Sequence, residues 1–120
     1  MWPLNLLRKS SETRIRKIDE RFATSGQIRP EEVEALAKQG FVAIVCARPD
    51  NEEFGQPSFD EVARAAEAEG MQIVHIPVSG PLGEGQIIRF HNAWENLPKP
   101  VLGYCRSGAR AGSLYATLTR

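Results

Sequence analysis

Short apolar runs alternate with longer amphipathic stretches along this chain. The run at 41–46 is continuous and rich in β-branched residues, which is typical of a parallel strand buried on both faces. Similar runs at 72–77 and 101–104 predict two more strands. Upstream, 14–18 and 21–24 flank a polar turn and predict a pair of short strands.

The amphipathic stretches predict helices between these strands. Apolar residues recur at helical spacing in four segments, 30–39, 59–69, 87–97 and 109–118. Ser58 and Glu61 have the spacing of a capping box, which places the start of the second helix. This alternation predicts an α/β fold, a mostly parallel central sheet flanked by helices with right-handed crossovers.

The length of 120 residues is enough for one core. We expect residues 1–13 to form a flexible tail and residues 14–120 a single α/β domain. The last helical pattern reaches Arg120 without a capping residue, so we expect a further helix or a partner domain beyond it.

Composition excludes several classes of partner. Lys plus Arg and Asp plus Glu number 15 each, and no basic stripe carries interleaved aromatic residues, so we expect no nucleic acid. The apolar start, 1–7, is too short for a signal peptide or membrane span, so no membrane contact is expected. Two cysteines are too few for a disulfide framework, which favours a cytoplasmic location, and no metal or cofactor set is evident.

The most informative segment is the Cys-Arg-Ser-Gly-Ala-Arg sequence at 105–110, which lies between the last predicted strand and the last predicted helix. A loop that turns backbone amides inward at a helix N-terminus binds anions, and the helix dipole adds to the positive field. Such a loop favours the thiolate of Cys105 as a nucleophile. The guanidinium of Arg110 provides forked donors suited to a tetrahedral oxyanion or a sulfur-bearing anion.

The residues between Cys105 and Arg110 complete the expected anion-binding loop: Arg106, Ser107, Gly108 and Ala109. Gly108 permits the backbone turn. Arg106 either points to solvent or extends the positive field. Ser107 either donates its hydroxyl to the thiolate or shapes the turn.

Two further loops, 50–57 and 79–85, follow predicted strands and should reach the same edge of the sheet. They and the preceding residues supply the remaining site candidates: Arg48, Asp50, Glu52, Glu53 and Glu84. We expect Arg48 to pair with Asp50 and brace the rim. Cys46 ends a predicted strand and is either a core cysteine or a second, resolving thiol for Cys105.

The loop, together with Ser-Gly-Gln-Ile at 25–28, Arg-Pro-Asp at 48–50, Gly-Gln-Pro-Ser at 55–58 and His-Ile-Pro-Val at 75–78, resembles the phosphatase-like domain of the beta-lactamase-hydrolase-like proteins. The resemblance covers about residues 14 to 118. It implies the fold of dual-specificity (cysteine) phosphatases. Some members of the family are fused to persulfide dioxygenase domains, which implies such a partner domain and a rhodanese-type sulfurtransferase role.

Two features distinguish phosphatase from sulfurtransferase activity: the length of the Cys105–Arg110 loop and the lack of an Asp as general acid. Cysteine phosphatases place five residues between cysteine and arginine, whereas this chain has four, as rhodaneses do. The 79–85 loop has no Asp to protonate a leaving alkoxide, which leaves Glu84 or Asp50 as the acid. Transfer of sulfur from thiosulfate or a persulfide needs little protonation.

We therefore favour a sulfurtransferase that forms a persulfide on Cys105. The first alternative is a cysteine phosphatase, a hydrolase that forms a phosphocysteine on the same residue from a phosphate ester. The second alternative is a module that binds anions without catalysis. All three readings expect a small anionic ligand at the loop.

Overall fold

The computed structural model describes residues 14–119, so the predicted tail at 1–13 lies outside the described residues, as does Arg120. A five-stranded sheet has the order β1-β2-β5-β3-β4. Its strands are β1 (Ile15–Lys17), β2 (Phe22–Ser25), β3 (Ala43–Cys46), β4 (Gln72–His75) and β5 (Val101–Tyr104). The helices are η1 (Pro30–Glu32), α2 (Val33–Lys38), α3 (Phe59–Ala68), α4 (Glu84–Asn96), α5 (Ala109–Ala116) and η2 (Thr117–Thr119).

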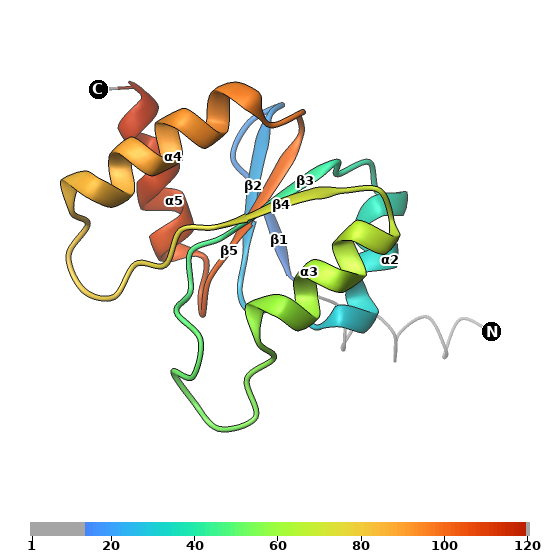
Figure 1. Ribbon diagram of the computed structural model, residues 1–120. Helices are drawn as coiled ribbons and strands as arrows, with labels where there is room; N and C mark the ends of the chain where they lie inside the picture. The colour runs from blue at the N-terminus through green and yellow to red at the C-terminus, as the bar shows by residue number, and fades with distance from the viewer. Residues whose placement is uncertain (1–13, 120) are drawn as a thin grey trace.

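Helices cover both faces of the sheet (Figure 1): α4 and α5 lie on one side, and α2 and α3 on the other. Two apolar clusters fill the spaces between these layers. Phe22, Val45 and Leu114 belong to the cluster that includes residues of α4 and α5, and Ile44 and Val62 belong to the other. The predicted α/β architecture with a mostly parallel sheet is confirmed.

Strand register brings four loops to one edge of the sheet. Only the β1–β2 hairpin is antiparallel, and β2, β5, β3 and β4 run parallel. Their last residues, Ser25, Tyr104, Cys46 and His75, stand side by side in register. The segments that follow these strands therefore leave the sheet together, and one of them is the Cys105 loop.

Local signals place the starts of α3 and of the helix at Pro30 as predicted, whereas α4 begins at Glu84, inside the predicted 79–85 loop and three residues before the predicted start at Ile87. Ser58 Oγ accepts the Glu61 amide at 3.1 Å, and the Glu61 carboxylate accepts the Ser58 amide at 2.8 Å, which is a capping box. The Pro30 helix begins as a 3₁₀ turn before it becomes α-helical.

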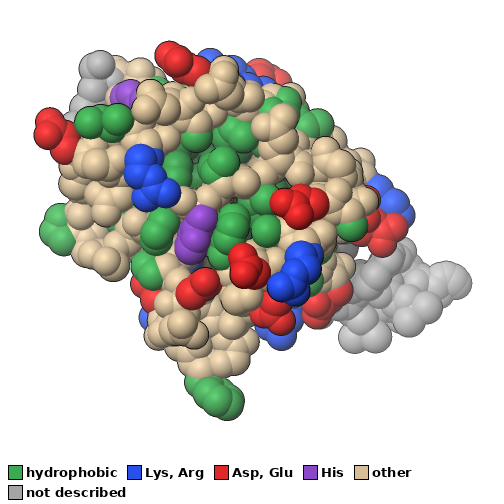
Figure 2. All heavy atoms as spheres, in the orientation of Figure 1, with side chains coloured by type: hydrophobic (Ala, Val, Ile, Leu, Met, Phe, Trp, Pro, Cys, Tyr) green, Lys and Arg blue, Asp and Glu red, His purple; other side chains and the backbone are tan. Residues whose placement is uncertain are grey.

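The outer surface carries charges of both signs. Figure 2 shows acidic and basic side chains interspersed over one face of the molecule. Across the described part of the chain, no helix combines the length and apolar character needed to cross a membrane.

Gly103, the third residue of β5, is packed too tightly for a side chain. A Cβ added there would lie 2.6 Å from Phe22 Cζ and 3.0 Å from Ala111 Cβ. Phe22 is 1% exposed and stacks on Tyr115 with ring centroids 4.2 Å apart, so it has little room to move. We predict that Gly103→Ala lowers the free energy of unfolding by about 1–3 kcal/mol, the usual range for overpacking.

Urea unfolding measures this effect, and Gly85→Ala is the matched control. Gly85 lies in α4, and a Cβ there would meet nothing within 4 Å. Its replacement should leave stability unchanged or raise it by up to about 1 kcal/mol, because alanine is the better helix former. Equal stability of the two variants would contradict the packing argument.

Candidate active site

The loop after β5 curls back so that its own amide contacts the cysteine sulfur. Gly108 has a φ of 97°, in the left-handed region that favours glycine, and caps the N-terminus of α5. Its amide donates to Cys105 Sγ at 3.0 Å. The Ala109 amide donates to Ser107 Oγ at 3.3 Å, so Ser107 shapes the turn. The sequence therefore builds the compact loop that was predicted.

The end of β2 supports this loop from one side. Ser25 O accepts the Cys105 amide at 3.4 Å. A Cβ on Gly26 would lie 2.8 Å from Arg106 O, and one on Gly108 would lie 3.3 Å from Ser25 O. Because both approaches need glycine, the Ser25–Gly26 step and the Cys105 loop fit together only with these residues.

Arg110 presents its guanidinium beside the sulfur and is already bound to a carboxylate. Nη1 donates to Glu52 Oε2 at 2.7 Å and to Val78 O at 2.7 Å, and Nη2 donates to Glu52 Oε1 at 2.9 Å. The pKa of Arg110 is raised, first by the hydrogen bonds with Glu52 and to a smaller extent by the nearby Cys105 sulfur. An anion that reaches Cys105 must therefore compete with Glu52 for the fork of Arg110.

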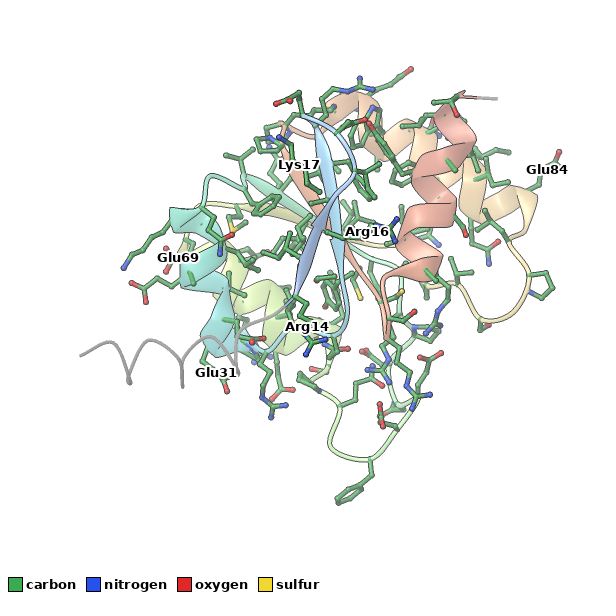
Figure 3. All side chains as sticks on the ribbon, turned by 180° about the vertical axis from the view of Figure 1, so that it is seen from behind. Arg14, Arg16, Lys17, Glu31, Glu69 and Glu84 are labelled. Atoms are coloured by element: carbon green, nitrogen blue, oxygen red, sulfur yellow. The ribbon has the colours of Figure 1, made fainter. Side chains whose placement is uncertain are left out.

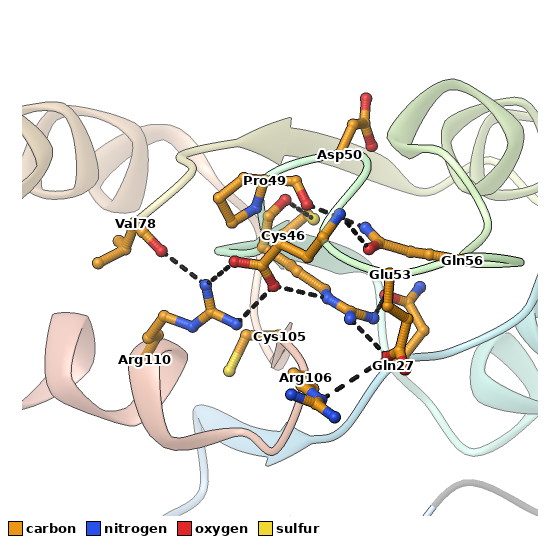
Figure 4. A network of polar contacts seen from close by, with 12 residues as sticks. Gln27, Cys46, Pro49, Asp50, Glu53, Gln56, Val78, Cys105, Arg106 and Arg110 are labelled. Carbon is orange, nitrogen blue, oxygen red and sulfur yellow. Dashed lines mark hydrogen bonds and ion pairs between the residues drawn. The ribbon is translucent and has the colours of Figure 1, made fainter. Parts of the chain in front are cut away.

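Arg48 is the buried arginine of the same network, because it shares Glu52 with Arg110; Figure 4 shows the network around Cys105. Its side chain is 2% exposed and donates to Glu52 at 2.9 Å, to Glu53 at 2.8 Å and to Gln27 Oε1 at 2.9 Å. It does not pair with Asp50 as predicted, because the two glutamates satisfy its guanidinium. Arg48 nevertheless stabilises this edge of the site, as predicted, because it connects the loop after β3 to the segment after β2.

Arg106 lies at the surface of the loop. Its side chain is 68% exposed and lies 3.6 Å from Glu53. Of the two orientations left open for it, the structure shows the one toward solvent, with a weak ion pair.

The two glutamates of the 50–57 loop are carboxylates rather than proton donors. The pKa of Glu52 falls from 4.5 to about 2, chiefly because of its hydrogen bonds with Arg110, which outweigh desolvation, and also because of Arg48. The pKa of Glu53 is also lowered, first by its hydrogen bond with Arg48. Neither residue therefore carries a proton at neutral pH to give to a leaving group.

Glu52 should stabilise the fold in a pH-dependent manner. Because its folded pKa of about 2 lies below its usual 4.5, the stabilisation is present above about pH 4.5 and is lost as pH falls through about 2. At about 1.36 kcal/mol per pH unit, the difference between these two pKa values has an upper bound of about 3.4 kcal/mol, and solvent screening of this exposed carboxylate reduces it to about 1–2 kcal/mol. We predict that Glu52→Gln lowers the free energy of unfolding by about 1–2 kcal/mol at pH 7 and by much less at pH 2.

Denaturant unfolding at both pH values checks this result. Glu84→Gln is the control, because Glu84 is an exposed first-turn residue of α4, and its loss should cost about 0.5 kcal/mol or less. A loss at Glu52 that is the same at both pH values would argue against the ion pairs as its source.

The structure does not support either residue predicted as a general acid. Asp50 Oδ1 accepts the Phe59 amide at 2.8 Å at the start of α3, and Figure 4 shows its side chain pointing away from Cys105. Glu84 lies exposed at the outer end of α4 (Figure 3). Both residues follow strands of the sheet and lie near the same edge as Cys105, as predicted. Asp50 instead caps α3 and Glu84 points to solvent, so neither side chain reaches the sulfur.

The structure also argues against Cys46 as a resolving thiol. Cys46 packs in the cluster with Ile44, whereas Cys105 packs in the cluster on the opposite face of the sheet. Burial raises the pKa of the Cys46 thiol to about 11, and its Sγ–H donates to Arg48 O at 3.4 Å. A buried, protonated thiol is a poor nucleophile, so Cys46 is a core residue.

Three residues that contribute to the site lie outside the 105–110 sequence that predicted Cys105 and Arg110. Glu52 was a site candidate with no assigned partner, and it proves to be the residue that bridges Arg48 and Arg110. Gly26 and Gln27 belong to the segment after β2, whose Ser-Gly-Gln sequence was noted only as part of a family resemblance. Their signal is the strand-to-loop position of that segment in a parallel sheet.

The parallel sheet, the cysteine loop after its central strand and the following helix together define a cysteine-phosphatase-like α/β domain. The family model for the phosphatase-like domain of beta-lactamase hydrolase-like proteins matches residues 14–119. This chain belongs to that family.

Two relatives are named beta-lactamase hydrolase-like protein. The beta-lactamase hydrolase-like protein of Agrobacterium fabrum is 41% identical over 100 residues, which cover 82% of this chain and 23% of the relative. The protein of that name from Xylella fastidiosa strain 9a5c is 39% identical over 104 residues, 86% of this chain and 24% of the relative. The chain thus spans about a quarter of the length of these relatives.

Solved structures confirm the fold. A candidate phosphatase from Neisseria meningitidis is 32% identical, with a TM-score of 0.79 over 88% of this chain and 75% of that one. The catalytic core of the PP-IP phosphatase SIW14 from S. cerevisiae is 19% identical, with a TM-score of 0.66 over 88% and 64%, and shows the fold alone. These similarities favour the phosphatase alternative over the sulfurtransferase that the sequence led us to prefer.

Proposed function

We propose that this domain is a cysteine-dependent hydrolase of small phosphate esters that works through a phosphocysteine on Cys105. The observation that carries the proposal is the contact of the Gly108 amide with Cys105 Sγ at 3.0 Å, with the Arg110 guanidinium beside the same sulfur. A positive nest of this kind stabilises both a thiolate and a bound phosphoryl group. Membership of a phosphatase-like family agrees with this chemistry.

The reaction proceeds in two displacements. The Cys105 thiolate donates an electron pair to phosphorus, and the P–O bond to the leaving group breaks with its electron pair on oxygen. Water then attacks the phosphocysteine, the S–P bond breaks, and phosphate and the thiolate are released. Loop amides and Arg110 hold the non-bridging oxygens in both steps, which requires Arg110 to turn at least part of its fork from Glu52 to the phosphoryl group.

The charge states of the carboxylates near Cys105 determine which leaving groups can depart. Glu52 and Glu53 are ionised, and Asp50 and Glu84 lie away from the sulfur. The described residues around Cys105 therefore offer no carboxylic acid to protonate an alkoxide. We infer that the preferred substrates have leaving groups that depart as stable anions, such as the phenolate of an aryl phosphate ester.

Sulfur transfer is the second candidate, and the same two features favour it. The loop has four residues between Cys105 and Arg110, and sulfite or a thiolate leaves without protonation. In that reaction the thiolate takes the outer sulfur of thiosulfate, sulfite leaves, and cyanide or a thiol accepts the sulfur. A partner domain such as a persulfide dioxygenase belongs with this candidate and stays a prediction.

One comparison of products separates the two candidates from each other and from a binding module. The chain is incubated with 4-nitrophenyl phosphate, and separately with thiosulfate and cyanide, while phosphate and thiocyanate are measured. We expect phosphate release that exceeds thiocyanate release in rate. Thiocyanate alone would support the sulfurtransferase, and the absence of both products would support an anion-binding module.

A further inference from the structure

A hollow of about 490 Å³ lies against the outer side of the Cys105 loop, between β1 and the start of α5. Ser107, Gly108 and Ala109 form its wall on the loop side. Arg14 and Arg16 form part of its opposite side, and Figure 3 shows Arg16 pointing toward α5 and Arg14 at the end where β1 begins. A volume of this size falls in the range of small-molecule sites, about 300–1,000 Å³.

The charge of this hollow is purely positive. Arg14 and Arg16 are the only charged residues among the described ones that line it. Arg16 lies in β1, and Arg14 directly precedes Ile15, the first residue of that strand; both residues line the hollow. Within residues 14–119, neither forms an ion pair, whereas Arg48 and Arg110 are each bound to a glutamate.

The polar groups of the hollow suit an oxyanion. Thr24 lies directly opposite Arg16 in the β1–β2 ladder and lines the hollow together with Ser107 and with Ser25, whose hydroxyl already donates to Gly26 O at 3.0 Å. Hydroxyl groups and arginines together are the usual donors to phosphate oxygens. Small residues at this end of α5, such as Gly112, leave the space open.

The hollow adjoins the proposed reaction centre. Gly108 lines it and also donates its amide to Cys105 Sγ at 3.0 Å, so one residue separates the two sites. A larger hollow of about 650 Å³ shares Arg14 and Ser107 with this one and carries acidic residues as well, Glu32 and Glu53. Its mixed charge makes it the less suitable site for an anion.

We propose that the hollow behind the Cys105 loop binds a second phosphoryl group of the substrate. The inference rests on the proposed function, because it assigns the reacting phosphoryl group to Cys105 and Arg110. Arg14 and Arg16 then select small molecules with two or more phosphoryl groups over monophosphates. Their contribution is to binding, since neither lies at the sulfur.

The test measures anion binding without turnover. Phosphate and tripolyphosphate are titrated calorimetrically into the Cys105→Ser chain at constant ionic strength. With both arginines present, we expect tripolyphosphate to bind at least about tenfold more tightly than phosphate, as one additional charge-assisted contact provides. In Arg14→Gln/Arg16→Gln this preference should fall to about threefold or less, with phosphate affinity unchanged within about twofold.

Two further variants exclude trivial causes. Arg29→Gln/Arg64→Gln removes the same charge, including Arg29 of the larger hollow, and should keep the full preference. Arg14→Lys/Arg16→Lys keeps the charge and should retain most of it, which excludes a loss of fold as the cause. An unchanged preference in Arg14→Gln/Arg16→Gln, or an equal loss in the Arg29/Arg64 variant, would overturn the proposal.

The outcomes also separate this proposal from the proposed function. A chain that releases phosphate from 4-nitrophenyl phosphate but shows no dependence on Arg14 and Arg16 contradicts the second site alone. A chain that shows this dependence but releases no phosphate supports the second site and contradicts the hydrolase.

Discussion

Replacing Cys105 with serine is expected to lower phosphate release from 4-nitrophenyl phosphate by at least about a thousandfold in kcat/KM, because the nucleophile is lost. A serine hydroxyl is not ionised at neutral pH, and the loop does not place a base beside it. The side chain keeps its size, and its oxygen still accepts the Gly108 amide, so the fold and the anion nest remain. Steady-state kinetics together with a thermal melt measure both quantities.

Cys46→Ser is the matched control, because it removes the other thiol of the chain. Cys46 is buried on the opposite face of the sheet, so turnover should stay within about threefold while stability falls. Equal losses of turnover at both cysteines, or more than a tenth of the activity left in Cys105→Ser, would contradict the assignment of the nucleophile.

Replacing Arg110 with lysine is expected to lower kcat/KM about a hundredfold, which is the usual cost of losing a preorganised donor to a developing oxyanion. Lysine keeps the charge but loses the planar fork that now contacts Glu52 and Val78 O. It can replace one of these contacts but cannot offer two parallel donors to a phosphoryl group. The effect should therefore appear in kcat as well as in KM.

Arg64→Lys on α3 is the control for this substitution, since Arg64 is an exposed helix residue. Its kinetics should match those of the unsubstituted chain. If Arg110→Lys also retains full activity, a point charge is sufficient at this position and the forked grip is unnecessary.

Much of the fold follows from periodicity and capping. Residues 43–46 of the apolar run at 41–46 form β3, an interior and fully buried strand, and the Ser58–Glu61 pair forms a capping box. Both signals are local, because a strand buried on both faces needs unbroken apolar sequence and a helix start needs an acceptor for its first amides. β3, which ends at Cys46, pairs in parallel with β5, which leads to Cys105.

The residues of the site that are close in sequence could be predicted, whereas their distant partners could not. Cys105, Gly108 and Arg110 are neighbours in sequence, so one motif reveals them together. The partner of Arg110 comes from residue 52, and the partner of Arg48 from residue 27, through loops whose course no spacing encodes. For the same reason, Asp50 and Glu84 were wrongly predicted as general acids. Their position at the sheet edge follows from the sequence, but the direction of their side chains does not.

The most direct test of Cys105 as the phosphoryl acceptor is to trap the intermediate. The chain is mixed with 4-nitrophenyl phosphate, quenched with acid within its first turnover, digested and examined by mass spectrometry. The account predicts a peptide that carries one phosphoryl group on Cys105 and that is absent from the Cys105→Ser chain. Phosphate release during that turnover with Cys105 unmodified, or with the phosphoryl group on another side chain, would contradict it.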